Sequence, residues 1–239
     1  ITCRDWSSDV CSSDLVQKGV KIRYNARVGA LEGSDGKVKL SEAGKSEIFE
    51  KVLVTVSPGQ LAKMAPSLGE SFLKGLLDLK HLGAVVMVVS LKHPLSPEGY
   101  YWYNLPKSAG FPFLALVEHT NFMDKSHYNN EHLIYCGDYL ENDHEYFKLS
   151  QEELLKRFLP SFARINPDFK PEWVNQVWLS KADYAQPVPF VNHSRNIPPI
   201  QTPISGLYFA SMSQVYPWDR GTNFAVEIGR RAARMIKDN

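Results

Sequence analysis

The chain has 239 residues, of which 44% are hydrophobic, and its 27 basic and 26 acidic side chains give a formal net charge of +1. This near balance excludes a strong charge-driven attraction to nucleic acid. No apolar run reaches the ~18 residues that a membrane-spanning helix needs, so the sequence predicts a globular protein with a sizeable core and no transmembrane segment.

Residues 1–15, ITCRDWSSDVCSSDL, fit no helix, strand or targeting signal. Asp5, Asp9 and Asp14 interrupt every apolar stretch, so we expect no export signal here. Residues 4–15 match one reading frame of a widely used DNA sequencing adapter at every position. We interpret them as a translated adapter artefact, with a natural disordered N-terminus as the alternative. Residues 1–15 are therefore expected to pack on nothing and to precede the C-terminal portion of a larger protein.

Excluding residues 1–15 changes the charge and cysteine counts. The segment holds one arginine and three aspartates, so the remainder has 26 basic and 23 acidic side chains and is mildly basic. Two of the three cysteines also lie in it, which leaves Cys136 alone. A single cysteine forms no intrachain disulfide, which agrees with a reducing compartment. We therefore expect a cytoplasmic protein.

Residues 16–65 are predicted to be rich in strands. Apolar runs over 19–32 and 38–42 flank a turn with two glycines, which is typical of a hairpin. A third run covers 47–57 and meets Pro58, after which a short helix is expected.

Residues 66–203 are predicted to mix helices and strands. We expect helices at 69–79 and 150–165 and strands at 82–91, 111–119, 131–140 and 172–182. The second helix places Leu154, Phe158 and Phe162 at intervals of four, which gives it an apolar face. The aromatic stretch at 100–104, YYWYN, fits either an apolar pocket wall or, more commonly, an alternating strand with core aromatics.

Residues 204–239 are predicted to form a strand at 206–211, an irregular turn and a closing helix from Thr222. Ala225, Ile228 and Ala232 give this helix an apolar face with small side chains. Its first backbone amides and positive dipole end would suit an electron-rich ligand atom. A helix that merely closes the core is the alternative.

Two stretches together resemble the FAD-dependent amine oxidase superfamily, which includes protoporphyrinogen oxidases. GLYFASMSQVYPWDRGTNFAVEIGRRAARMI resembles its C-terminal flavin segment, with small residues at Ala225, Gly229, Ala232 and Ala233. Residues 19–58 resemble the strands and proline turn ahead of its substrate domain. The resemblance implies an α/β fold with an α+β substrate domain. The chain would be the C-terminal part of a two-domain, Rossmann-type FAD/NAD(P)-binding flavoprotein that lacks its N-terminal dinucleotide-binding part.

The resemblance also divides the chain and implies a chemistry. Residues 16–65 would be FAD-domain strands, 66–203 the substrate-binding domain and 204–239 an FAD-domain strand and helix. FAD would be the cofactor, and hydride would pass from a C–H bond of a small-molecule substrate to flavin N5. The implied cofactor-binding residues are Val28, Ser57, Pro58, Ala210, Ser211, Met212, Thr222, Asn223 and Phe224. Candidates for the substrate pocket are Tyr184, Gln186, Tyr216 and Trp218.

The sequence departs from the superfamily pattern at several positions. Ser211 and Met212 stand where a glycine and an acid are usual, and Asn223 and Phe224 replace Glu-Gly. The strand at 82–91 contains no lysine, although Lys80 precedes it, which argues against a strict amine substrate. No Gly-x-Gly-x-x-Gly is present, so we expect this chain alone not to bind FAD tightly. No catalytic residue or oligomeric state is indicated.

Other functions remain open at this point. One is a flavoenzyme without net oxidation that resembles UDP-galactopyranose mutase, and another is a β-rich binding domain without a cofactor. A metal site is not expected, because the candidate ligands have no compact ligand spacing. These candidates are Glu118, His119, His127, His132, Asp138, Asp143 and His144.

Overall fold

The structure is a computed structural model that describes residues 14–238. These residues form two compact units. We call residues 14–20 and 82–186 the five-stranded unit, and residues 21–81 and 187–238 the two-sheet unit. Asp14 and Leu15 are exposed, as expected, but they begin a short helical turn that the sequence did not predict. Residues 1–13 lie outside the described range, so the expectation for them stays a prediction.

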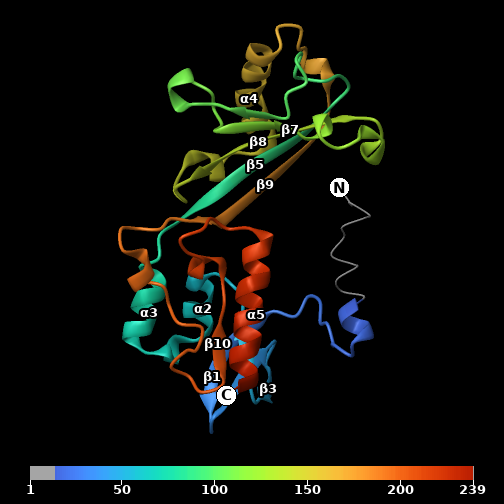
Figure 1. Cartoon of the computed structure of the whole chain (residues 1–239). Coiled ribbons are helices and arrows are strands. Elements are labelled where there is room, and N and C mark those ends of the chain that lie inside the picture. Colours follow the sequence, from blue (N-terminus) through green and yellow to red (C-terminus); the bar gives the residue numbers. More distant parts are fainter. Residues whose placement is uncertain (1–13, 239) are drawn as a thin grey trace. The chain divides into compact units, whose positions relative to one another are not determined.

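The five-stranded unit is built on one sheet with strand order β6-β7-β8-β5-β9 (Figure 1). The strands are β5 (His81–Leu91), β6 (Trp102–Asn104), β7 (Ala115–Glu118), β8 (His132–Leu140) and β9 (Val174–Pro187). Alternate residues of β5, namely Val85, Met87 and Val89, are buried in the core. This alternation follows from the two-residue period of a strand and places the apolar core on one face of the sheet.

Helix α4 (Gln151–Ile165) packs on that core. Ser150 caps its first turn, with its side chain accepting from the Glu153 amide and the Glu153 side chain accepting from the Ser150 amide. Phe158 and Phe162 are buried, and the Phe158 ring meets Phe113 edge to face at 5.0 Å. The predicted apolar face of this helix is therefore the face that closes the core.

The two-sheet unit contains an antiparallel sheet and a parallel strand pair. Strands β1 (Val28–Ser34), β2 (Lys37–Glu42) and β3 (Lys45–Phe49) form the first. Asp35 and Gly36 have φ of 48° and 77° in the tight β1–β2 turn, as a two-residue hairpin requires. The second sheet pairs β4 (Val52–Val54) with β10 (Leu207–Phe209) in parallel.

Three helices complete this unit: α2 (Pro58–Met64), α3 (Glu70–Leu77) and α5 (Thr222–Asp238). Helix α5 lies along β10, where Ile228 and Ala232 pack with Tyr208 and Ala210 (Figure 1). Lys51 precedes β4, and its Nζ donates to the carbonyl of Ile236 at 2.7 Å. The end of α5 therefore lies at the start of β4, and α5 begins near the opposite edge of the strand pair.

The structure corrects several predicted boundaries. Residues 19–27 form no strand, since Gly19 and Asn25 adopt positive φ and no strand pairs with this run. The run 47–57 divides into β3 and β4, and of 111–119 only β7 is a strand. Pro112 has no amide to donate to a neighbouring strand, so the strand does not extend back to Phe111. Residues 66–81 and 187–203 belong to the two-sheet unit, so the predicted substrate segment 66–203 contributes to both units.

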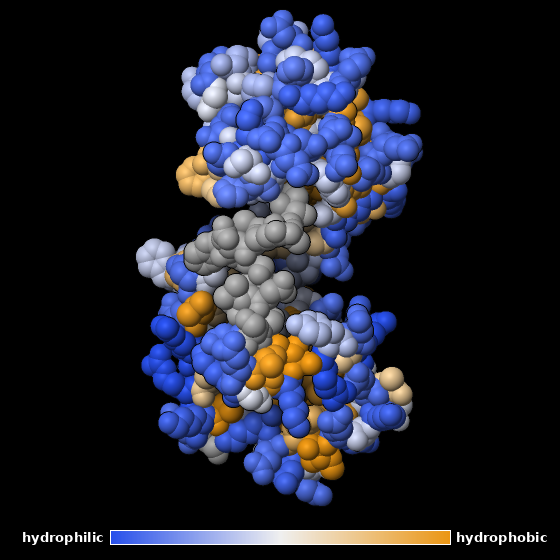
Figure 2. Space-filling view, turned by 90° about the vertical axis from the view of Figure 1, so that its right-hand side faces the viewer, coloured by the Kyte–Doolittle hydropathy of each residue, from blue (hydrophilic) through white to orange (hydrophobic). Residues whose placement is uncertain are grey.

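Figure 2 shows hydrophilic side chains over most of one face of each unit, with smaller apolar areas among them. Among residues 14–238, no helix combines the length and the apolar content that crossing a bilayer requires.

Candidate functional site

The carboxyl ends of β4 and β10 meet at one edge of their parallel sheet. Val54 is the register partner of Phe209, so the residues that follow each strand emerge side by side. Ser57 and Pro58 follow β4, and Ala210 to Met212 follow β10. Ligands of open α/β sheets bind outside this edge. Five predicted cofactor-binding residues therefore gather at the edge where a cofactor is expected.

Ser57 and Pro58 form the entry to α2. The Ser57 hydroxyl accepts from the Gln60 amide at 3.3 Å, and Pro58 occupies the first helical turn. Both residue types are favoured there, because the serine satisfies a free amide and the proline has no amide to leave unpaired. The proline turn expected from the sequence is thus a capped helix start.

The segment after β10 is held by its own side chains. The amide of Ala210 donates to the Val54 carbonyl at 3.0 Å. The Ser211 amide donates to Gln214 Oε1 at 2.7 Å, and the Ser211 hydroxyl lies 2.6 Å from that of Ser213. Gln214 in turn donates to the Pro198 carbonyl at 3.0 Å. The polar groups of Ser211 are engaged within this turn, which is therefore a rigid scaffold.

The first turn of α5 offers two backbone donors. The amides of Phe224 and Ala225 donate to the Gly221 carbonyl at 3.1 and 3.0 Å, so these two are occupied. Within residues 14–238, the amides of Thr222 and Asn223 have no hydrogen-bond acceptor. Such amides at a positive dipole end favour anions. Of the three predicted residues here, Thr222 and Asn223 keep a free donor and Phe224 does not.

Aromatic rings surround the segment that leads into α5. Trp218 stacks in parallel on Phe224, with centroids 6.2 Å apart and 9° between the planes. The Tyr216 ring lies 5.5 Å from that of His193, which is buried. The Nδ1 atom of His193 has no hydrogen-bond partner among the described residues. Trp218 therefore packs on the first turn of α5 and Tyr216 packs on His193, and their role as walls of a substrate pocket stays a prediction.

Val28 lines a separate cavity of the two-sheet unit, with a volume of about 410 Å³. The cavity lies between the beginning of β1 and the end of β4 with helix α2. Two of its lining side chains, Arg27 and Lys63, are cationic and exposed. The complete lining is Ala26, Arg27, Val28, Gly29, Val56, Gln60, Lys63 and Met64.

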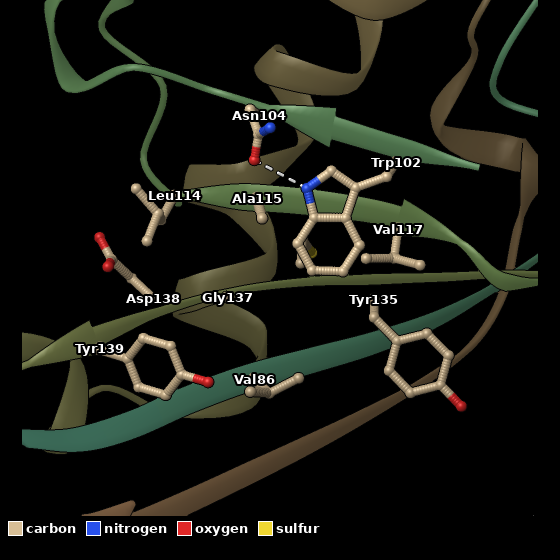
Figure 3. A pocket seen from close by; sticks show the side chains of 11 residues that line it. Val86, Trp102, Asn104, Leu114, Ala115, Val117, Tyr135, Gly137, Asp138 and Tyr139 are labelled. Carbon is tan, nitrogen blue, oxygen red and sulfur yellow. Dashed lines mark hydrogen bonds between the residues drawn. The ribbon is translucent and has the colours of Figure 1, made fainter. Parts of the chain in front are cut away.

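The five-stranded unit has a hollow of about 200 Å³ on one face of its sheet (Figure 3). The strand register places Trp102, Val117 and Tyr135 in one row across this face. Asn104, Ala115, Gly137 and Val86 form the next row. Their neighbours Leu116, Cys136 and Met87 point to the core on the other face. The hollow therefore lies on the face of the sheet opposite to the core that α4 covers.

A buried carboxylate holds the chain that leads to Trp102. Glu118 is fully buried and accepts from the amides of Leu95 and Ser96 at 2.8 and 2.6 Å. The Ser96 hydroxyl lies 2.5 Å from that of Tyr103. Burial raises the pKa of Glu118, and the hydrogen bonds to its carboxylate oppose that rise only in part. The Glu118 amide also donates to the Tyr101 carbonyl at 2.9 Å, so this network fixes β6 beside β7.

The aromatic stretch at 100–104 divides between the two predicted roles. Tyr103 packs against the core, whereas Trp102 is 52% exposed and lines the hollow. Sequence reasoning missed Tyr135 and Tyr139, which also line it. The alternation of β8 indicates that Tyr135 and Tyr139 share a face, but only the strand registers place that face beside Trp102.

The predicted substrate-pocket residues are distributed over both units. Tyr184 and Gln186 lie on β9 in the five-stranded unit. Tyr216 and Trp218 lie in the two-sheet unit. None of the four lines the hollow beside Trp102.

Three of the candidates for metal binding, Glu118, His119 and His144, have other hydrogen-bond partners. His119 Nε2 lies 2.8 Å from the Tyr128 hydroxyl, and its ring meets Tyr135 edge to face at 5.6 Å. Burial lowers the pKa of His119. Within residues 14–238, no three His, Cys, Asp or Glu side chains gather as a metal ion would require.

A family model of flavin-containing amine oxidoreductases matches residues 9–237. The chain belongs to this amine oxidoreductase family. The resemblance seen in the sequence is thereby confirmed, and so are its implications of a flavoprotein oxidoreductase fold and an FAD cofactor for the family. No curated protein sequence matches this amine oxidoreductase chain significantly.

Solved structures share the fold. A protein from an Exiguobacterium species, assigned as a protoporphyrinogen oxidase, has a TM-score of 0.73 at 16% identity, covering 95% of this chain and 51% of that one. A putrescine oxidase bound to putrescine has a TM-score of 0.69 at 17% identity, covering 97% and 53%. Reduced UDP-galactopyranose mutase has a TM-score of 0.59 at 13% identity, covering 76% and 39%. This amine oxidoreductase chain thus spans about half the length of the first two.

Proposed function

We propose that this chain is the C-terminal portion of an FAD-dependent oxidoreductase in which a substrate C–H bond gives hydride to flavin N5. The observation that carries the proposal is the distribution of the predicted cofactor-binding residues. All nine lie in the two-sheet unit, and five of them gather at the carboxyl edge of β4 and β10.

The residues of this unit fit an extended dinucleotide. The cavity beside Val28 is large enough for a planar base, and its cationic side chains Arg27 and Lys63 favour a ligand that carries phosphate. The free amides of Thr222 and Asn223 lie at the beginning of a 17-residue helix. They would hold the negative charge that develops on the cofactor when it is reduced.

The bound flavin supplies the two-electron acceptor, and the chain's own groups place it and tune its charge. Ser57 and Pro58 fix the beginning of α2. The Ser211–Gln214 turn holds the end of β10 rigid. The substrate is a small molecule, and we propose a cytoplasmic location, in keeping with Cys136 as the single cysteine of residues 14–238, which is buried and forms no disulfide.

The test uses the complete protein, with its reading frame extended upstream in clean genomic sequence. Purified protein should carry FAD or take it up on reconstitution, and a substrate should bleach the flavin absorbance under anaerobic conditions. A colourless protein that cannot be reconstituted with FAD would contradict the proposal.

The structural likeness to UDP-galactopyranose mutase keeps one alternative in view. In that case the protein would work with flavin that an external reductant has already reduced, and its substrate would undergo no net oxidation. Product analysis separates the two, because an oxidoreductase yields a product two electrons more oxidised for each flavin reduced.

A further inference from the structure

One carboxyl group, that of Asp138, lies at the margin of the hollow on the five-stranded sheet, and the other side chains that line the hollow are uncharged or aromatic. Trp102, Tyr135 and Tyr139 supply aromatic rings, and Val86, Ala115 and Val117 supply aliphatic surface. Asn104 is a polar lining residue, and its Oδ1 already accepts from Trp102 Nε1 at 2.8 Å. A ligand in this hollow therefore meets rings and methyl groups.

Asp138 lines the hollow and His119 lies behind Tyr135, and neither side chain presents a charge to the centre of the hollow. Asp138 is the register partner of Val85, so it belongs to the opposite face of the sheet. Figure 3 shows its carboxylate at the margin, directed away from Trp102. His119 contacts Tyr135, and burial lowers the pKa of His119, which keeps its imidazole neutral at neutral pH.

The floor of the hollow is flat because two of its residues are small. Gly137 has no side chain, and Ala115 beside it has a single methyl group. With a volume of about 200 Å³, the hollow accommodates one ring or a fused ring pair lying on this floor. Trp102 stands next to Ala115 and Val117, where its indole can contact a planar ligand (Figure 3).

We propose that this hollow binds an uncharged planar ring of the substrate, with Trp102 as its stacking partner. The inference rests on the proposed function and narrows its substrate class. An ammonium group would lose its water here without a carboxylate on the same face to replace it, which is unfavourable. The ring that enters the hollow therefore carries no amine, although the family is named for amine substrates.

The experiment compares three probes with the same ring system, namely 2-naphthol, 2-naphthylmethylamine and 2-naphthoate. Equilibrium dialysis against the 239-residue chain at neutral pH measures the three dissociation constants. We expect 2-naphthol to bind at least about tenfold more tightly than the cation and the anion. Equal or tighter binding of 2-naphthylmethylamine would overturn the proposal. So would a loss of its binding in the Asp138→Asn variant, because the Asp138 carboxylate would then be a partner of the ammonium group.

Variants locate the probe. Ala115→Phe fills the floor and should abolish 2-naphthol binding, and Trp102→Ala should weaken it about tenfold. Trp178→Ala is the matched control, because Trp178 is a similarly exposed tryptophan of the same sheet (40% against 52%) that does not line the hollow. Binding that is unchanged in both Trp102→Ala and Ala115→Phe would overturn the assignment.

A measurement on the unmodified chain covers the case in which a variant fails to fold. The indole N–H resonance of Trp102 should shift on titration with 2-naphthol, and an unmoved resonance would count against the proposal. All these readouts proceed without flavin. Intact 2-naphthol binding in a protein that cannot take up FAD would refute the proposed function alone.

Discussion

The carboxylate of Glu118 accepts a hydrogen bond from the amide of Ser96 at 2.6 Å, across 22 positions of sequence and without exposure to solvent. A buried acid held in this way connects the loop after β5 to the end of β7. It also makes the five-stranded unit sensitive to pH.

Glu118→Gln tests that sensitivity. The folded-state pKa of Glu118 is raised above its usual 4.5 by burial, so the folded chain keeps a proton that the unfolded chain has lost. The favourable contribution of this group is complete below about pH 4.5 and declines as pH rises through the folded-state pKa. Because glutamine does not titrate, the difference in unfolding free energy between the wild type and the variant should shrink with rising pH. Urea unfolding over a pH series measures it, and a difference that grows with pH would contradict the expectation.

Phe158→Ala tests the packing of α4 on the sheet. Phe158 is fully buried against Phe113, so its removal leaves a cavity and should lower the unfolding free energy by about 3–5 kcal/mol. Lys156→Ala on the exposed face of the same helix is the control and should change it by no more than about 0.5 kcal/mol. Denaturant unfolding of both variants provides the comparison, and equal losses would show that α4 does not close this core.

Glycine replacements should have opposite effects at two positions. A Cβ on Gly137 would lie 2.5 Å from the Val85 carbonyl oxygen, so Gly137→Ala should destabilise the sheet by about 1–3 kcal/mol. A Cβ on Gly59 meets nothing within 4 Å, and in helix α2 Gly59→Ala should stabilise by about 0.5–1 kcal/mol. Hydrogen exchange reports each unit separately, and a Gly137→Ala protein with unchanged protection in β5 and β8 would refute the first expectation.

Thr222→Pro removes one backbone donor from the proposed flavin site while leaving its helix intact. Proline is well tolerated at the first helical position, where Thr222 lies. Losing a hydrogen bond to a charged group costs about 1.5–3 kcal/mol, which corresponds to a reduction potential lower by about 30–60 mV for a two-electron couple. Potentiometry of the FAD-loaded complete protein measures it. Thr222→Ala keeps the amide and should leave the potential unchanged, so an equal fall in both variants would exclude the backbone donor as the cause.

Much of the fold could be predicted where local pattern and tertiary packing agree. The apolar spacing of Leu154, Phe158 and Phe162 predicted α4, and the valine-rich run predicted β5, because each buries the face that its own period creates. The prediction of a strand over residues 19–27 was wrong, because no other strand pairs with this run. Strand pairing is a property of distant residues, and a local pattern does not contain it.

The candidate site divides in the same way. The proline turn at Ser57 and the helix beginning at Thr222 could be predicted, because capping and dipole chemistry are local. The hollow beside Trp102 could not be predicted from the sequence, because it depends on the registers that bring β6, β7, β8 and β5 together. The engagement of the Phe224 amide by Gly221 is likewise visible only in the structure.

The pairing of β4 with β10 has a consequence for the order of synthesis. The five-stranded unit is drawn mainly from the continuous stretch 82–186, whereas β4 waits for a partner that begins at Leu207. Domains generally fold as units while the chain emerges from the ribosome. The five-stranded unit can therefore be folded while β4, which precedes Ser57, still lacks its partner strand β10. A nascent chain stalled before Leu207 would display one finished unit and an unpaired β4, a natural point for chaperones to engage.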